Sequence, residues 1–340
     1  MKYRIVLACL VFVIVYATGS FYGKPIIVRH EAVNGNDTDI DADFSQEASA
    51  ISTRKKRINR VSTTTVTAPV TPTTTTTTTT PTTTSTPTPA PQPTSTFVQT
   101  FDSAFTVTET GSKTESKNTD WWVSSGAYFT SESGVGKTVS GALGALDPWR
   151  VAYYLSNSLD TDNGYHPQNI FRLVQRSLWT NYTEEAYFKI TKDNLSVSPN
   201  RNASNGIFFF NRYKDAFNLY YAGLRVDGYA VIKKKTNGSY YTMAYKPFIA
   251  GGSYNRDTNP DILPKNEWIG MKNEVRTLAD GTVSIKLYAD KGKTGTWTLV
   301  AEAVDDGTTF GGAVIGGSGN VGIRTDFMDV EVDTYTVTSL

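Results

Sequence analysis

The stretch GLRVDGYAVIKKKTNGSYYTMAY (Gly223–Tyr245) decides the fold class. Three short runs rich in aromatic and β-branched residues are separated by the dipeptides Asp227-Gly228 and Asn237-Gly238. Both dipeptides favour two-residue type I′ turns, because the two central residues of such a turn need positive φ angles. The stretch therefore predicts a three-stranded antiparallel meander. We expect Lys233–Lys235 to lie on a solvated sheet edge, where lysines discourage the addition of further strands.

A second hairpin is predicted from Trp268 to Ala289, with its turn at Asp280-Gly281. Its second strand alternates apolar and polar side chains, which is typical of an antiparallel sheet with one buried face. No stretch of residues 97–340 keeps a 3.6-residue apolar period, so helices are not expected to dominate. We therefore predict an all-β domain over residues 97–340, a two-sheet antiparallel β-sandwich.

The residues before this domain predict an export leader and a stalk. Residues 1–23 join a basic start to an apolar run, which is typical of a signal peptide and nearly long enough for an N-terminal apolar membrane helix. Cleavage of the leader and its retention as a membrane anchor through residues 5–23 both remain open. Residues 24–60 are polar and expected to be disordered, and residues 61–96 form a Thr/Pro-rich stalk. Either alternative places the domain outside the cell, secreted or at its surface.

Composition excludes several classes of protein. The only cysteine, Cys9, lies in the apolar leader, so the domain cannot be a small disulfide scaffold. Residues 97–340 carry 24 basic and 26 acidic side chains, a near-neutral balance that is a poor match for nucleic acid. Glycosylation stays open through the Thr-rich stalk and the Asn-x-Ser/Thr sequons at Asn36, Asn181, Asn194, Asn202 and Asn237.

The order of motifs in the domain resembles the concanavalin A-like lectin/glucanase superfamily, particularly its laminin-G-like and sugar-hydrolase-like jelly rolls. An opening strand is expected at Phe101–Phe105 and is followed by the Trp268 hairpin. A strand at Trp297–Val300 then leads into Asp305-Asp306-Gly307, and the chain closes on Gly322–Tyr335. The resemblance covers residues 97–340. It implies a jelly roll with one concave sheet and with sugar binding or sugar cleavage in that groove, although fold alone does not fix function.

The closing strand raises the question of catalysis. Family 16 glycoside hydrolases of this superfamily carry Glu-x-Asp-x-x-Glu on one strand, and Glu331 and Asp333 match its first two positions. Thr336 stands at the third position, and a threonine cannot protonate a leaving group near neutral pH. We therefore expect Asp329, Glu331 and Asp333 on the outward side of a strand. The apolar side of that strand, Met328, Val330 and Val332, is expected in the core.

Two groups of acidic residues are candidate metal sites. Asp333 and Asp102 are candidates for a structural calcium site, because the first and last strands of jelly rolls are often neighbours. The run Asp160-Thr-Asp162-Asn163-Gly164 resembles a calcium loop, but it is one residue short of the EF-hand pattern and is expected to form a turn.

The richest chemistry lies between Tyr165 and Arg176. Polysaccharide lyases with a similar sandwich use Arg and Gln or Asn to neutralise a uronate carboxyl, and they use His and Tyr to move protons. That resemblance makes His166, Arg172 and Tyr221 candidate catalytic residues, with Tyr187, Tyr213 and Tyr220 as further candidate tyrosines. The aromatic rings also suit stacking on sugars. The candidate carbohydrate-binding residues are Trp122, His166, Gln168, Arg172, Trp179 and Tyr221.

Three functional hypotheses follow. The first is a carbohydrate-binding or adhesion module presented on a stalk, whose partner is a polysaccharide or other glycan. The second is a polysaccharide-cleaving enzyme, a lyase or glycoside hydrolase, that uses the concave face. The third is a structural protein of the cell envelope.

Overall fold

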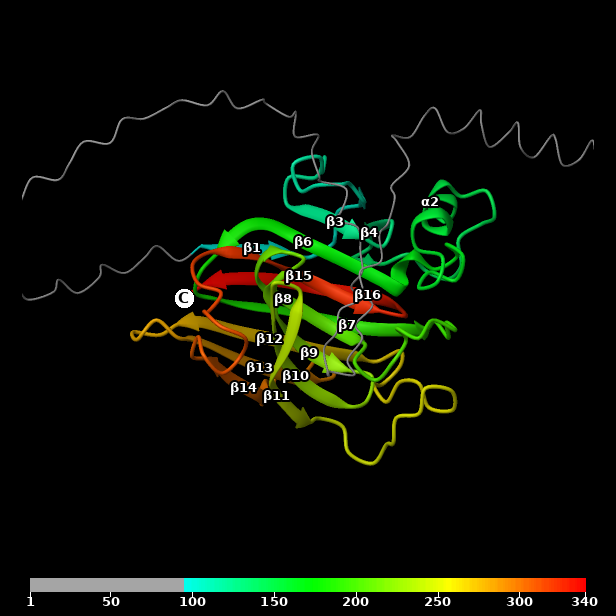
Figure 1. Ribbon diagram of the computed structural model, residues 1–340. Coiled ribbons are helices and arrows are strands. Elements are labelled where there is room, and N and C mark those ends of the chain that lie inside the picture. The colour runs from blue at the N-terminus through cyan, green and yellow to red at the C-terminus, as the bar shows by residue number, and fades with distance from the viewer. Residues whose placement is uncertain (1–94) are drawn as a thin grey trace, which may run out of the picture.

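The computed structural model describes residues 95–340, which form two antiparallel sheets stacked as a sandwich (Figure 1). The strands of the first sheet are β1 (Thr96–Gln99), β2 (Phe105–Thr108), β4 (Tyr128–Glu132), β5 (Val135–Lys137), β7 (Tyr182–Asp193), β12 (Trp268–Thr277), β13 (Val283–Lys291), β14 (Thr298–Asp305) and β16 (Met328–Ser339). This nine-stranded sheet has the order β14-β13-β12-β7-β16-β5-β4-β2, with β1 paired to β16.

The second sheet contains seven strands in the order β11-β10-β9-β8-β15-β6-β3. Its strands are β3 (Trp121–Ser125), β6 (Ile170–Trp179), β8 (Gly206–Asp215), β9 (Asn218–Arg225), β10 (Tyr229–Thr236), β11 (Ser239–Pro247) and β15 (Gly319–Asp326). The predicted all-β sandwich is thus confirmed. The predicted leader, the disordered segment and the stalk up to residue 94 lie outside the described residues.

The core lies between the sheets and is rich in aromatic rings. Phe188 of β7 meets Phe209 of β8 edge to face at 5.5 Å, and Trp121 of β3 meets Tyr335 of β16 at 4.9 Å. Both pairs join one sheet to the other and are fully buried. Each such side chain contributes about 2 to 3 kcal/mol through removal of apolar surface from water, so these contacts hold the layers together.

The predicted meander is confirmed as β9, β10 and β11. Asn237 and Gly238 both have positive φ angles, as a type I′ turn requires, but only Gly228 does at the first turn, so the predicted type I′ turn at Asp227-Gly228 is wrong. The prediction of a solvated edge for Lys233–Lys235 is wrong. β11 pairs along the far side of β10, so β10 is an interior strand. All three lysines are buried, and Lys234 points between the sheets, where its Nζ lies 2.8 Å from Asp305 Oδ2.

The hairpin of β12 and β13 is confirmed, but the opening of the domain differs from the prediction. The expected strand at Phe101–Phe105 is wrong, because Phe101 has a φ of +61° and ends the extended run after β1. Its ring still enters the core, and the Ser131 hydroxyl donates to the carbonyl oxygens of Phe101 and Ser103.

Between the strands of residues 95–340 lie helix α2 (Pro148–Ser156) and the 3-10 turn η2 (Pro167–Asn169). The Asp147 carboxylate accepts a hydrogen bond from Trp149 N, and Pro148 opens the helix, a favoured N-terminal arrangement. Only Tyr153 of this helix is buried, so the sequence has no apolar period that would predict the helix. Over residues 95–340, no helix has both the length and the apolar character that a bilayer crossing demands.

Candidate functional site

The structure places the six predicted sugar-binding residues in three separate regions. Trp122, Arg172 and Tyr221 lie on the outward face of the seven-stranded sheet, and all three are buried. His166 and Gln168 lie in a polar network at the end of β6, around η2. Trp179 belongs to the main core, where its ring nitrogen donates to Gln175 Oε1 at 3.1 Å.

The outward face of the seven-stranded sheet carries a second cluster of aromatic rings. Tyr221 stacks on Tyr240 at 6.0 Å, and the Arg324 guanidinium lies 5.1 Å from the Tyr221 ring centroid. The strand register places Arg172 beside Arg324 on the neighbouring strand. Two of the three predicted catalytic residues therefore share this face, whereas His166 lies beyond the end of the sheet.

Near Arg172, Glu109 is the carboxyl with an unusual protonation equilibrium. Burial raises its pKa to about 7, against the opposing effects of hydrogen bonds from Tyr153 and Ala127 and of the Arg172 charge. The Tyr153 hydroxyl donates to Glu109 and accepts a hydrogen bond from Gly126 N at 2.7 Å. Tyr153 itself is buried. The pair fastens helix α2 to the turn between β3 and β4.

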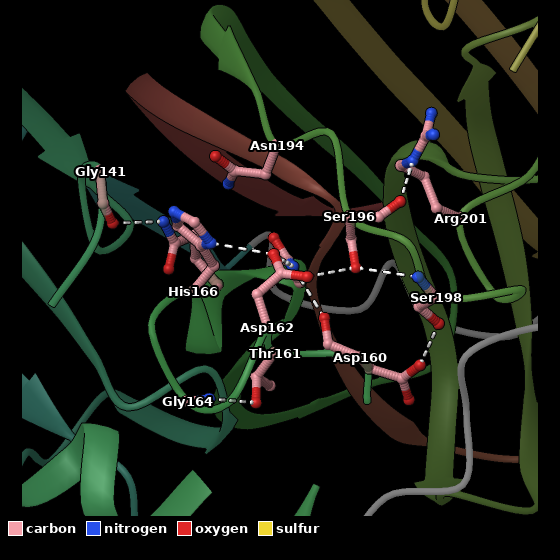
Figure 2. Close-up of polar contacts among 12 residues, drawn as sticks. Gly141, Asp160, Thr161, Asp162, Gly164, His166, Asn194, Ser196, Ser198 and Arg201 are labelled. Atoms are coloured by element: carbon pink, nitrogen blue, oxygen red, sulfur yellow. Dashed lines mark hydrogen bonds and ion pairs between the residues drawn. The ribbon is translucent and has the colours of Figure 1, made fainter. Parts of the chain in front are cut away.

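The polar network around η2 is shown in Figure 2. Asp160 Oδ1 accepts hydrogen bonds from Ser198 Oγ at 2.6 Å and from Asn200 Nδ2 at 2.9 Å. His166 Nδ1 lies 2.9 Å from Asp162 Oδ2. Burial raises the pKa of Asp162, but hydrogen bonds from His166 and Ser196 outweigh it and leave the pKa lowered.

The predicted turn at residues 160–164 is confirmed, with positive φ angles from Asp162 to Gly164. A third carboxylate, Asp329, is also buried here. It accepts from Gln168 Nε2 at 2.8 Å, from Asn194 Nδ2 at 2.9 Å and from Gly141 N at 2.7 Å. N–H and O–H groups thus satisfy these carboxylates. These hydrogen bonds tie the loops at this end of the sandwich to β16.

The acids of the closing strand have different surroundings. Met328, Val330 and Val332 are in the core, as predicted. Asp329 is buried, so the expectation of a solvated row is wrong for this residue. Glu331 and Asp333 are partly exposed and pair with lysines, Glu331 with Lys189 at 2.5 Å and Asp333 with Lys293.

The calcium role of Asp102 and Asp333 stays a prediction. Asp102 is exposed, and Asp333 has Lys293 as a cationic partner. Within residues 95–340, no three His, Cys, Asp or Glu side chains come together in a group suited to a metal ion.

Three partly exposed aromatic side chains lie close together on the outward face of the nine-stranded sheet: Tyr187 of β7, Trp268 of β12, and Trp297 just before β14. We call these three residues the aromatic platform. The rings of Tyr187 and Trp297 lie 5.7 Å apart at an interplanar angle of 35°. Lys293 Nζ lies 5.4 Å from the Tyr187 centroid and 5.6 Å from the Trp268 centroid, so the lysine joins the two parts of the platform.

Gly270 provides the space for the two closest rings. It lies beside Tyr187 in the register of β7 and β12. A Cβ atom at Gly270 would lie 2.8 Å from Tyr187 Cε1 and 2.9 Å from Trp297 Cη2, which is closer than real Cβ contacts. The missing side chain therefore allows both rings to approach the strand.

Asp290 of β13 holds the segment that carries Trp297. Its carboxylate accepts from Thr294 N at 2.8 Å, Thr294 Oγ1 at 2.6 Å and Gly295 N at 2.8 Å. The Tyr187 hydroxyl also lies 3.4 Å from Asp290 Oδ2. One buried carboxylate thus fixes the loop and one edge of the platform.

The charges around the aromatic platform are balanced. Lys189 pairs with Glu331, Lys272 lies 3.6 Å from Glu185, and Lys293 pairs with Asp333. Lys189 and Lys272 also lie over the Trp268 and Trp297 rings, at 4.7 and 5.2 Å from the ring centroids. The surface therefore combines partly exposed rings with hydrogen-bonding groups and carries no large net charge.

Sequence reasoning missed this surface. Tyr187 was only one of several candidate tyrosines, and Trp268 and Trp297 entered only as markers of the fold. Period-two alternation places Tyr187 and Trp268 on outward faces of their strands. The position of Trp297 depends on a loop that returns to β12, and no local pattern predicts that return.

No family model matches the sequence. No curated protein matches it either. Similar solved structures include the carbohydrate-binding module CBM66 from Bacillus subtilis, at 17% identity and a TM-score of 0.35 over 50% of this chain and 83% of that one. They also include the GH43 BlXynB protein from Bacillus licheniformis, at 12% identity and a TM-score of 0.37 over 72% of this chain and 39% of that one.

A variant of LamA from Z. galactanivorans, in complex with laminaritriose and laminaritetraose, matches at 9% identity and a TM-score of 0.37, over 72% of this chain and 98% of that one. The chain spans well under half the length of BlXynB. Identities and TM-scores this low carry neither a family nor an activity over to this chain.

Proposed function

We propose that the protein is a non-catalytic carbohydrate-binding module that holds a glycan on the aromatic platform. The observation that carries the proposal is the Tyr187–Trp297 ring pair, which is partly exposed and seated above Gly270. The C–H faces of sugar rings are apolar and stack on flat aromatic surfaces, while neighbouring polar groups bind the hydroxyls. Lys272 and Lys293 and their acidic partners supply such groups at the edges of the rings.

The balanced charges favour a neutral polysaccharide. A uronic acid polymer would bring carboxylates beside Glu185, Glu331 and Asp333, and the nearby lysines are already paired with these acids. Like charges that meet without compensation weaken binding. The leader and the Thr/Pro stalk support presentation of the module outside the cell, secreted or membrane-anchored, and this localisation is part of the proposal.

The test is binding of the full-length protein to neutral polysaccharides (cellulose, mixed-linkage β-glucan, xylan, mannan and chitin) and to polygalacturonate. We expect retention on at least one neutral polymer and a loss of roughly tenfold or more in affinity on Trp297→Ala or Tyr187→Ala, because stacked rings contribute about 1 to 3 kcal/mol each. Trp149→Ala is the matched control, since Trp149 is a partly exposed tryptophan on α2. Binding that the two platform variants leave unchanged would contradict the proposal, and absence of binding to every polymer would favour the cell-envelope role.

A second candidate function, cleavage of a polysaccharide, has one observation in its favour. The carboxyl of Glu109 has a pKa of about 7, which suits a general acid or base, and Arg172 lies close enough to affect it. Release of reducing ends or unsaturated products from the same polymers, abolished by Glu109→Gln, would establish this function.

A further inference from the structure

A pocket of about 340 Å³ opens beside the aromatic platform at the start of β12. Its lining is mainly apolar and consists of Phe248, Ile249, Ile262, Pro264, Trp268 and Ile269, with Glu267, Lys291 and Gly292 completing it. The volume lies at the lower end of the range for small-ligand sites and is sufficient for one substituted ring.

The pocket and the aromatic platform share structural parts. Trp268 belongs to both. Lys291 at the end of β13 and Gly292 just after it line the pocket, and Trp297 at the end of the segment that follows belongs to the platform. Asp290, which accepts hydrogen bonds from Thr294 and Gly295, therefore positions both sites together. A glycan chain stacked on the platform would therefore reach the pocket where it passes Trp268.

The pocket walls are fixed before any ligand arrives. The Gly228 carbonyl accepts hydrogen bonds from Phe248 N and Ile249 N, each at 2.9 Å. Ile262 N donates to the Val226 carbonyl at 2.7 Å. These bonds tie the loop after β11 to the turn between β9 and β10. A preformed apolar pocket needs little ordering when it binds, so more of the interaction energy appears as affinity.

We propose that this pocket takes an aryl substituent carried by the glycan that the platform binds, an inference that rests on the proposed function. Phe248 and Trp268 present aromatic surface, and the three isoleucines supply aliphatic contacts. A bare sugar ring would leave hydroxyls without partners against this lining, whereas an aryl ring leaves none. Lys291 Nζ lies 5.0 Å from the Phe248 centroid, and with Glu267 it gives the pocket a polar component that the linking oxygen of a glycoside or ester can meet.

The experiment is calorimetric titration of the full-length protein with paired methyl and 4-nitrophenyl β-glycosides of glucose, xylose, galactose and mannose. We expect the aryl glycoside of at least one sugar to bind roughly tenfold tighter than its methyl counterpart, a ratio that burial of one aromatic ring readily supplies. Ile262→Asp should abolish the preference and leave methyl glycoside binding unchanged. Phe248→Ala is a second pocket variant with the same expected result. Leu178→Asp, at an exposed leucine of β6 outside the pocket, is the control that should keep the preference.

The two proposals fail in different ways. Equal affinity for the methyl and aryl members of every pair, or a preference that survives both pocket variants, would overturn the pocket assignment and leave the platform standing. An aryl preference that Ile262→Asp removes and Trp297→Ala leaves intact would support the pocket and overturn the platform. Loss of all binding on Trp297→Ala, with loss of only the preference on Ile262→Asp, is the result expected if both are correct.

Discussion

The rings of Tyr187 and Trp297 lie 5.7 Å apart over a strand position where Gly270 has no side chain to separate them. Gly270→Ala should therefore displace at least one ring and lower the glycan affinity by roughly threefold to tenfold, the range expected when a stacked contact is partly lost. Binding isotherms measure this loss of affinity on a polymer to which the wild-type protein binds. Gly144→Ala is a matched control, because a Cβ there has nothing within 4 Å. An equal effect of both variants would show that the space left by the missing side chain of Gly270 has no role in binding.

The buried ion pair of Lys234 and Asp305 predicts a large effect on stability. Neither side chain is exposed, and the Tyr220 hydroxyl also donates to Asp305. Lys234→Met would leave Asp305 without its counterion and should cost about 3 to 5 kcal/mol in the free energy of unfolding. Urea denaturation measures this cost. Arg276→Met, which breaks the more exposed pair with Glu274, should cost less than about 1 kcal/mol.

Asp329→Asn should be more damaging than its similar shape suggests. Both carboxylate oxygens of Asp329 accept hydrogen bonds from N–H donors. An asparagine has one acceptor oxygen, so its NH2 group would face another donor, at a cost of about 2 to 3 kcal/mol. Glu331→Gln on the same strand is the comparison, because Glu331 is partly exposed. Equal stability of the two variants in thermal and urea unfolding would contradict the structural role of Asp329.

The raised pKa of Glu109 predicts a pH-dependent stability. The pKa is about 7 in the folded protein against an ordinary value of 4.5, so the folded state binds a proton that the unfolded state releases in this range. Stability contributed by the protonated form is therefore fully present below about 4.5 and is lost as the pH rises toward 7.

Glu109→Gln removes this titration while keeping an oxygen that can accept from Tyr153 and Ala127. The variant should gain stability relative to the wild type between pH 5 and pH 8, as measured by urea unfolding at constant ionic strength. A difference between the two proteins that does not change with pH would show that Glu109 titrates normally.

The calcium site predicted at Asp102 and Asp333 is also testable. Lys293 already neutralises Asp333, so we expect the Tm of the protein to be the same in calcium and in chelator. A rise in Tm with calcium that Asp333→Asn abolishes would establish the site instead.

Turn chemistry and alternation predicted much of the fold. Asp227-Gly228 and Asn237-Gly238 fixed the meander, and the alternation of Val283, Ile285 and Leu287 fixed the buried face of β13. The positive φ angle of Phe101 was beyond such rules, because a bulky residue rarely adopts it and only tertiary contacts hold it there. Lys234 was likewise misplaced, since its partner Asp305 lies 71 positions further along the chain.

The candidate site was harder to predict than the strands. His166, Arg172 and Tyr221 were grouped by chemical type, but η2 separates His166 from the sheet face that carries the other two. The platform depends on the register of β7, β12 and β13 and on the loop that Asp290 holds. Pairing between strands far apart in sequence carries that information, and no single stretch contains it.

The pairing of β1 with β16 determines how a force applied to the N-terminal side of the domain passes through the first sheet. Figure 1 shows β1 near the end of the molecule where the chain terminates, and Thr96 lies opposite Thr338 in the register. A pull applied through the residues before Thr96 enters the fold at β1 and passes through β16 into β7, where Asp333 lies beside Tyr187. Two antiparallel ladders thus connect the residues before Thr96 to the aromatic platform. β1 has only four residues, so its ladder with β16 is shorter than the ladder between β16 and β7. Under tension we therefore expect β1 to detach from β16 first, which would leave the aromatic platform intact.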